Sequence, residues 1–408
     1  MKKNPRVLLV ATMDTKAEET LYVEAVLKEQ GLQVLIMDPG IMGDVPHAVA
    51  VTREEVVRAA GSSLAEVRAI GHEGKALDVM ISGAVRCALS LHQKDEIHGI
   101  IALGGSMGTT LGTAVMRAFP VGFPKVMIST MASRDTRHFV GTRDILMLYA
   151  VCDINGLNRM TKKVLRNGAL AVAGMVQGKP SEAEDKKPLV ALSTLGTIED
   201  CSRPVKQALE TRGYEVVVFH GVGAGGAAME EMIREEEVDA VVDLSLHEIA
   251  DRLFGGDYDA GPDRGRGALQ EGIPTLLVPG NIDFLAAGPM AEAERRFPGR
   301  RCHQHNAAIT CVRSEKDEIE AVGKVLAGYC NESRGPVSLL VPLEGFSALD
   351  RQKGPLHDPE GPLLFEKAFR QALKKQISVE GLPLHINDEA FAWAVIERFD
   401  EMMAESGQ

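Results

Sequence analysis

VLLVATMDTKAEETLYVEAVLKEQGLQVLIMD, residues 7–38, contains two apolar runs separated by an amphipathic segment. The apolar runs predict buried β-strands. In the segment between them, apolar residues recur with the 3.6-residue period of a helix, which a glycine then closes. The same order recurs in LVALSTLGTIEDCSRPVKQALETRGYEVVVF, residues 189–219, at a constant offset of 182. The matched identical pairs are Thr12 and Thr194, Thr15 and Thr197, Leu27 and Leu209, and Gly31 and Gly213. An offset held over this length predicts an internal duplication.

The strand runs are apolar enough to be covered on both faces, which is typical of a parallel sheet. Further strands are expected at residues 99–103, 125–129, 145–151, 239–244, 275–278, 308–312 and 337–341. We therefore predict an α/β fold with two tandem Rossmann-like, doubly wound parallel-sheet domains. The polar segment GKPSEAEDKKP predicts a linker. The expected boundaries are 1–178 for the first domain, 179–188 for the linker, and 189–408 for the second domain with a C-terminal helical extension.

Composition excludes several classes of protein. The chain carries 45 Lys and Arg against 57 Asp and Glu, a formal net charge of −12, so we expect no nucleic-acid partner. No apolar run approaches the roughly 18 residues that cross a bilayer, so we expect no membrane segment. The 6 cysteines form no CxxC pair and are typical of reduced thiols. Residues 1–13 are basic and then apolar, like a signal peptide, but no small-residue cleavage site follows, so we expect a first β-strand there and a cytoplasmic protein.

Three loops of the first half carry groups suited to an anion, and in a parallel sheet such loops meet at the carboxyl edge. In the first loop, Thr15 and Glu18 match a capping-box pattern that exposes backbone N–H groups at a helix start. In the second, GGSMGTT at residues 104–110, small residues let amides and hydroxyls approach phosphate oxygens. The third, ISTMASRDT at residues 128–136, offers further hydroxyls and a carboxylate.

Each loop also has a purely structural interpretation, as tight packing, helix capping or a solvated first turn. The comparison of the two halves favours a ligand. The second half keeps both threonines of the first loop but has Gly196 and Ile198 at the positions of Asp14 and Lys16. Because the threonines were kept and the charged pair was not, Asp14 and Lys16 indicate a ligand specific to the first half.

An ordered series of motifs spans the chain from residue 7 to about residue 400. The motifs are ATMDTKAEE, ALGGSMGTT, ISTMASRD and GTRDILMLYAVCDINGLNR in the first half, and GVGAGGAAME, AGPDR, GNIDF and the pair His305 and Asn306 in the second. Together they resemble the Tm-one-like ATP-binding family, which groups bacterial proteins with the N-terminal domain of a tomato mosaic virus resistance protein. The resemblance implies two Rossmann-like halves, ATP bound with Mg²⁺ in the first half, and a homodimer.

The resemblance also implies which residues hold the nucleotide, and Asp14 is the expected Mg²⁺ ligand. One departure is Arg134, which stands where the family usually has glycine. An arginine there could contact the γ-phosphate or obstruct the loop, and both alternatives stay open. The implied ATP-binding residues are Thr12, Asp14, Thr15, Lys16, Gly105, Ser106, Gly108, Thr109, Ser129 and Thr130.

The second half has its own candidates. Residues 221–226, GVGAGG, match a dinucleotide fingerprint, although they follow the second strand of their unit rather than the first. Polar residues near predicted strand ends could form a cleft for a small-molecule acid or perform acid–base chemistry. Asp283 and His305 are the expected catalytic residues. The other members of this set are Asp243, Ser245, His247, Glu248, Arg264, Asn281 and Asn306.

Three functions stay open on the sequence alone. The first is an ATP- and Mg²⁺-binding enzyme of small-molecule metabolism that uses the nucleotide as co-substrate or regulator. The second is a regulatory protein that binds nucleotide without catalysis. The third is an NAD-dependent oxidoreductase that uses the GVGAGG loop. No residue pattern specifies a reaction.

Overall fold

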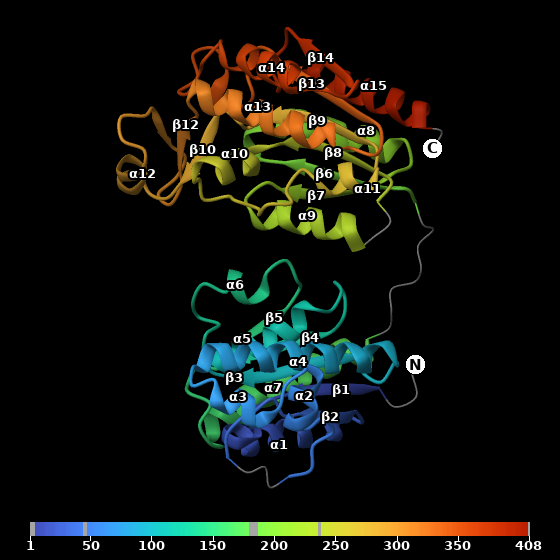
Figure 1. The fold of residues 1–408 in the computed structure, drawn as a ribbon, viewed down its shortest axis with the longest axis vertical. Coiled ribbons are helices and arrows are strands. Elements are labelled where there is room, and N and C mark those ends of the chain that lie inside the picture. Colours follow the sequence, from blue (N-terminus) through green and yellow to red (C-terminus); the bar gives the residue numbers. More distant parts are fainter. Residues whose placement is uncertain (1–4, 44–46, 179–186, 236–237, 407–408) are drawn as a thin grey trace. The chain divides into compact units, whose positions relative to one another are not determined.

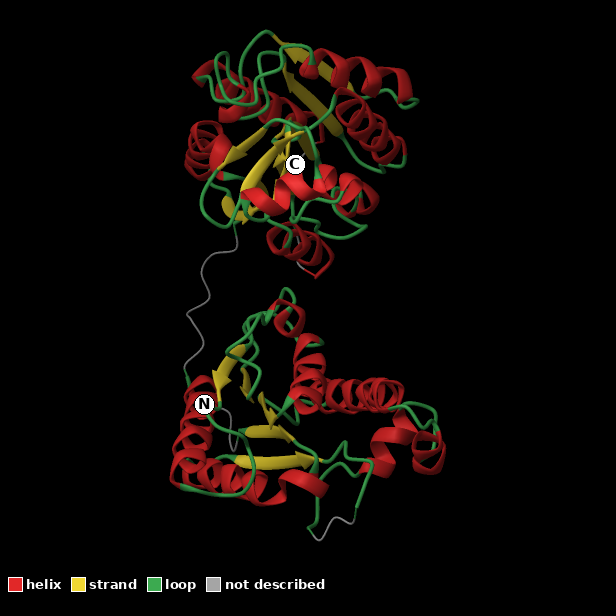
Figure 2. Ribbon diagram, turned by 90° about the vertical axis from the view of Figure 1, so that its left-hand side faces the viewer, coloured by secondary structure: helices red, strands yellow, loops and turns green. Residues whose placement is uncertain are grey.

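The computed structural model describes residues 5–43, 47–178, 187–235 and 238–406 (Figures 1 and 2). It divides into two compact units, Met1–Glu182 and Ala183–Gln408. Each unit is built on its own parallel sheet, which confirms the predicted α/β fold. Of the predicted linker, residues 179–186 lie outside the described residues.

The first unit has five parallel strands in the order β2-β1-β3-β4-β5. This is the doubly wound order in which the chain first moves to one side of β1 and then to the other. Its elements are β1 (Arg6–Val10), α1 (Met13–Glu29), β2 (Gln33–Met37), α2 (Arg53–Ala59), α3 (Leu64–Ala69), α4 (Glu73–Gln93), β3 (Gly99–Gly104), α5 (Ser106–Arg117), β4 (Lys125–Ser129), α6 (Arg137–Val140), β5 (Leu146–Tyr149) and α7 (Arg159–Gln177).

Both faces of this sheet are buried, because successive side chains of a strand point to opposite faces. Leu8 and Val10 of β1 pack in one core with residues of α2, α4 and α5. Val7 and Leu9 pack in the other core with residues of α1 and α7. Figure 2 shows helices on both sides of the yellow strands of this unit. Burial on both faces explains why the strand sequences are continuous apolar runs.

The second unit has six parallel strands in the order β14-β13-β9-β8-β6-β7 and a separate antiparallel sheet, β10-β12-β11. Its elements are β6 (Leu189–Thr194), η1 (Gly196–Ile198), α8 (Glu199–Thr211), β7 (Glu215–His220), α9 (Ala224–Glu235), β8 (Ala240–Ser245), α10 (His247–Phe254), α11 (Gly267–Glu271), β9 (Thr275–Gly280), β10 (Phe284–Ala287), α12 (Met290–Arg296), β11 (Cys302–Gln304), β12 (Thr310–Arg313), α13 (Lys316–Asn331), β13 (Val337–Pro342), η2 (Ala348–Asp350), α14 (Gly361–Ala372), β14 (Ser378–Leu382) and α15 (Glu389–Ser406). The strand expected at 308–312 therefore lies in the small antiparallel sheet, not in the main one. β14 adds an edge strand beside β13, and α15 packs against α8.

The strands of each main sheet can be numbered by their order along the chain. In both sheets they then lie side by side as second, first, third, fourth and fifth, and the second sheet adds β14 as a sixth strand. The matched helices also begin alike. Lys16 in α1 has φ −129° and ψ 22°, and Ile198, its counterpart 182 residues on, has φ −126° and ψ 21°. A shared kink at matched positions is what a duplicated strand–helix–strand unit predicts.

Candidate functional site

A pocket of about 400 Å³ lies at the carboxyl edge of the first sheet, where β1 and β3 are neighbours. At this point the connections diverge to opposite sides of β1, and open α/β sheets bind ligands at such switch points. The lining residues are Val10, Ala11, Thr12, Asp14, Thr15, Lys16, Pro39, Gly40, Ile41, Met42, Glu73, Leu77, Met80, Leu103, Gly104, Gly105, Ser106, Met107, Gly108 and Leu111. The first two predicted loops therefore meet around one cavity.

The first loop enters α1 through the kink at Lys16. Thr12 is the N-cap residue of α1, and Thr15 lies inside its first turn. The predicted capping box of Thr15 with Glu18 is wrong, because the helix begins three residues earlier than that pattern requires. The Thr15 hydroxyl instead pairs with the Thr12 hydroxyl, with 2.9 Å between the oxygens. Both hydroxyls lie at the pocket with Asp14 and Lys16.

The second loop presents the N-terminus of α5 to the pocket. Gly105 is the N-cap residue, and no side chain caps the helix. The amides of Ser106, Met107 and Gly108 have no acceptor within the helix, and with the helix dipole they form an arrangement that binds anions. The turn requires glycine, because a Cβ on Gly104 would lie 2.9 Å from the Cα of Gly108.

Thr109 and Ser129 are not among the residues that line the pocket. Both are fully buried, and their hydroxyl oxygens are 2.6 Å apart. Thr109 also donates to the carbonyl of Gly105 at 2.7 Å, so this pair ties the third loop to the second. Thr130 approaches Gly105, and its hydroxyl lies 3.9 Å from the position of a Cβ there. Arg134 is exposed and is not among the residues that line the pocket.

The ammonium group of Lys16 donates to the carbonyl oxygen of Ile154, in the loop that follows β5. The amide of Gly156, in the same loop, donates to the Glu19 carboxylate at 2.7 Å. The motif DINGLNR therefore contributes to the site indirectly, by holding the start of α1. This role was not predicted from the sequence.

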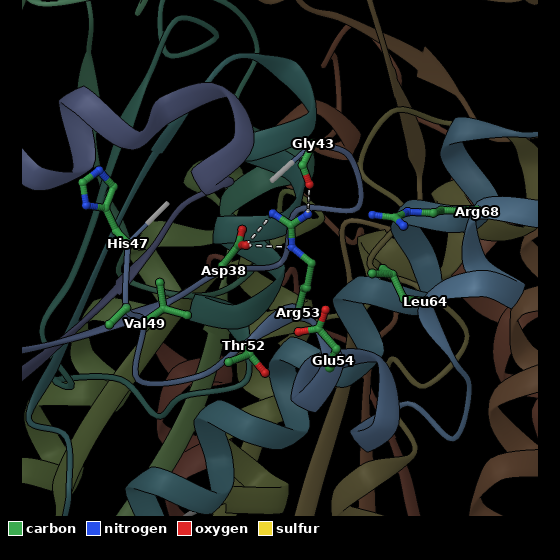
Figure 3. A pocket seen from close by; sticks show the side chains of 10 residues that line it. Asp38, Gly43, His47, Val49, Thr52, Arg53, Glu54, Leu64 and Arg68 are labelled. Carbon is green, nitrogen blue, oxygen red and sulfur yellow. Dashed lines mark hydrogen bonds and ion pairs between the residues drawn. The ribbon is translucent and has the colours of Figure 1, made fainter. Parts of the chain in front are cut away.

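Asp38 and Arg53 were also missed, although Asp38 directly follows β2, where dinucleotide-binding folds place a ribose-binding acid. Here Asp38 is 1% exposed and accepts bonds from Arg53 Nε at 3.0 Å and Arg53 Nη2 at 2.7 Å (Figure 3). It also accepts bonds from the amides of Met13 and Gly40, each at 2.9 Å. Arg53 Nη1 donates to the carbonyls of Met42 and Gly43. This buried pair therefore braces the loop that forms one wall of the pocket, and Asp38 is not free for a ligand.

The pocket has a polar part and an apolar part. The polar part holds one cation, Lys16, the free amides of α5, and hydroxyls, which are groups that bind phosphate. The apolar part is made mainly by Val10, Ile41, Met42, Leu77, Met80, Leu103, Met107 and Leu111. A ligand with one anionic end and one apolar end would satisfy both parts.

Asp14 has the chemistry to contribute to a Mg²⁺ site. One of its oxygens accepts a bond from the amide of Met42 at 3.0 Å. Within the described residues no group of three or more His, Cys, Asp or Glu could hold a metal. Mg²⁺ commonly uses one or two carboxylates together with phosphate oxygens and water, so a single aspartate beside a phosphate site fits this ion.

In the second domain, amides of the GVGAGG loop already bind a carboxylate of the protein itself. The carboxylate of Glu248 accepts bonds from the amides of Gly223 at 2.6 Å and Gly226 at 3.0 Å. These amides would have to bind the pyrophosphate of a dinucleotide. Glu248 is fully buried, and a Cβ on Gly226 would lie 1.9 Å from its Oε2 atom. The loop is thus arranged around a protein carboxylate, which disfavours the NAD interpretation.

Glu248 belongs to a buried ionic network centred on Arg264. Arg264 is 1% exposed, pairs with Glu248 at 2.6 Å, and binds both oxygens of Asp243 at 2.6 and 2.8 Å. The carboxylate of Glu230 lies 3.9 Å away. Burial alone would lower the pKa of Arg264, but Asp243 and Glu248 outweigh it and raise that pKa. This network packs α9 and α10 onto the sheet and leaves Arg264 no free face for a ligand.

The structure does not bring Asp283 and His305 together. Asp283 is fully buried before β10, where its carbonyl accepts a bond from the amide of Ser314 at one end of β12. His305 is exposed at the other end, where its amide bonds the carbonyl of Ile309. The four residues of β12 lie between Ile309 and Ser314 and separate these ends by roughly 15 Å. Burial raises the pKa of Asp283, whose carboxylate accepts a bond from the Ser347 hydroxyl at 2.7 Å.

The fold and this pocket define a two-domain α/β protein with a candidate anion site in its first domain. The chain belongs to the uncharacterised protein family UPF0261, whose N-terminal domain matches residues 5–181 and whose C-terminal domain matches residues 187–403. No helix within the described residues has the length and apolar character needed to cross a membrane.

Relatives match almost the whole chain. A UPF0261 protein of Clostridium tetani is 36% identical over 98% of this chain and 99% of its own length. The ToMV resistance protein Tm-1 of Solanum lycopersicum is 30% identical over 99% of this chain and 56% of its own length, which confirms the relationship predicted from the motifs. Among solved structures, the match to a Streptomyces glycosyltransferase, SsfS6, covers 98% of this chain and 96% of that chain, with 12% identity and a TM-score of 0.20.

Proposed function

We propose that the first domain binds ATP together with Mg²⁺. The observation that carries this proposal is that Lys16 and the uncapped N-terminus of α5 line one pocket that also has an apolar wall. The phosphates of ATP would lie at the ammonium group and the amides. The base would lie against the side chains contributed by α4 and α5.

The charges of the pocket make the proposal specific. Lys16 is the one cation among the lining residues, and Asp14 and Glu73 are carboxylates. A triphosphate placed next to Asp14 would be repelled unless a divalent cation lay between them. We therefore expect Asp14 to support Mg²⁺ directly or through water, and we expect ATP binding to weaken strongly when Mg²⁺ is chelated.

Isothermal titration of the full chain with ATP and Mg²⁺ tests the proposal. Replacing Lys16 and Asp14 by Ala should weaken binding about 10- to 100-fold, the effect of losing a charge-assisted hydrogen bond. Lys163→Ala is the matched control, because Lys163 is exposed on α7 and is not a lining residue. An unchanged Kd in the double variant would refute the assigned site, and no binding by the wild type would refute the function.

The contacts of the second domain support its predicted role less directly than the pocket supports the role of the first. Since Asp283 and His305 lie apart within that domain, we do not assign a shared catalytic step to this pair. Binding of a small-molecule acid there, a cytoplasmic location and formation of a homodimer stay predictions. Light scattering of the purified chain tests the homodimer.

A further inference from the structure

The loop that follows β5 starts with a strained turn. Val151 has φ 65°, and the amide of Cys152 bonds the carbonyl of Ala150 at 2.7 Å across it. This is a γ-turn with a positive φ at its centre, which is unfavourable for any side chain and most of all for a β-branched one. Val151 is also 55% exposed, so packing of its side chain does not compensate the strain. Other contacts must hold the loop in this conformation.

Two contacts from the start of α1 hold the loop. The ammonium group of Lys16 donates to the carbonyl of Ile154, and the carboxylate of Glu19 accepts the bond from the amide of Gly156. The loop is anchored at its base by a third bond, from the amide of Ala150 to the carbonyl of Ser129 at 2.9 Å. The buried side chain of Ile154 and a bond from the Thr161 hydroxyl to the carbonyl of Gly156, at 3.1 Å, also hold the loop. Glu19 is 2% exposed, whereas Lys16 is half-buried and also lines the candidate ATP pocket.

We propose that Lys16 is a latch that couples nucleotide binding to the loop 150–156, a regulation that rests on the proposed function. With the pocket free, the ammonium group holds the carbonyl of Ile154 and keeps the strained turn closed. A bound phosphate attracts the ammonium group more strongly than a neutral carbonyl does, because both partners are then charged. The carbonyl of Ile154 loses its donor, and the loop opens from the γ-turn at Val151.

The chemistry of the coupling is electrostatic, and no covalent step is involved. Its consequence is local: ligand binding protects the amides at the start of α5 and loosens the loop 150–156. Opening exposes the half-buried Cys152 and changes the surface beside the start of α7. A partner that binds this surface would distinguish the nucleotide-bound protein from the free one.

Hydrogen exchange of the full chain, followed by mass spectrometry, tests the latch. The informative amides are Cys152 and Gly156, because both are hydrogen-bonded in the closed loop. We expect ATP with Mg²⁺ to accelerate exchange in peptides covering residues 150–158 about tenfold or more, the effect of losing one charge-assisted hydrogen bond. Peptides covering residues 104–110 should exchange more slowly. The Lys16→Met variant should show the fast exchange without nucleotide, and Lys163→Met is the control with no change.

The results of hydrogen exchange and calorimetry distinguish the latch from the proposed binding of ATP. Exchange at 150–158 that is unchanged in Lys16→Met overturns the latch, whatever the nucleotide does. Calorimetric binding of ATP without faster exchange in that segment also overturns the latch and leaves the proposed function standing. An absence of ATP binding overturns the proposed function, while fast exchange in Lys16→Met would still identify Lys16 as the side chain that holds the loop. The arm with wild-type protein needs no substitution, so a variant that fails to fold does not block the test.

Discussion

Replacing Arg264 by Met should strongly destabilise the second domain at neutral pH. The substitution keeps an unbranched side chain of similar length but removes the charge at the centre of a buried network. Asp243 then keeps its bond from the Ser193 hydroxyl, and Glu248 keeps two glycine amides, but neither carboxylate has a cation. Arg264→Lys should also be costly, because an ammonium group cannot reproduce the fork to both oxygens of Asp243.

The size of the effect follows from the number of partners lost. Breaking one buried ion pair by removing a partner costs about 3–5 kcal/mol, and Arg264 pairs directly with two carboxylates. A loss of at least about 5 kcal/mol is a large part of the roughly 5–15 kcal/mol that keeps a domain folded.

Urea unfolding followed by the fluorescence of Trp393 measures this directly, because the chain has 1 tryptophan and it lies in the second domain. Arg203→Met is the matched control: its partner Asp200 is 3.7 Å away and both side chains are more than half exposed. The control should change the free energy of unfolding by about 0.5 kcal/mol or less. If Arg264→Met lost no more than this control, the account of the network would be wrong.

Two further predictions concern other buried charges. Arg53→Met should destabilise the first domain by about 3–5 kcal/mol, because it leaves Asp38 buried and unpaired. The far-UV circular dichroism transition should then shift while the Trp393 fluorescence midpoint stays in place, and a joint shift of both signals would contradict the prediction. Burial, with a contribution from the charge of Asp283, raises the pKa of Asp350 from 3.8 to about 7. Its proton is therefore held more tightly in the folded state, and the stability it contributes is full below about pH 4 and is lost as the pH rises to about 7. The difference in unfolding free energy between wild type and Asp350→Asn should vary across this window and level off above it; a difference constant from pH 4 to pH 7 would count against the raised pKa.

Much of the fold was predictable because local patterns and chain order carry it. Apolar runs separated by a helix-period segment predict parallel strands, and the glycine that closes the helix marks each unit. The first pocket was predictable for the same reason, since loops that follow adjacent parallel strands meet at one edge. The antiparallel sheet was not predictable, because the run at 308–312 is as apolar as the neighbouring strands, and only its pairing partners reveal its direction.

The sequence by itself determined the class of fold, the duplication, and a group of residues around the first switch point, because hydrophobic period and loop position are local properties. Only the tertiary structure decided which polar residues are free. Asp38 lies next to a glycine-containing loop and Glu248 faces another, as ligand-binding acids do. The carboxylate of each already accepts hydrogen bonds from protein groups elsewhere in its domain. Lys16 is likewise held by a carbonyl 138 residues away. Whether a charged group can bind a ligand depends on such distant partners, and their identity is set by packing rather than by spacing along the chain.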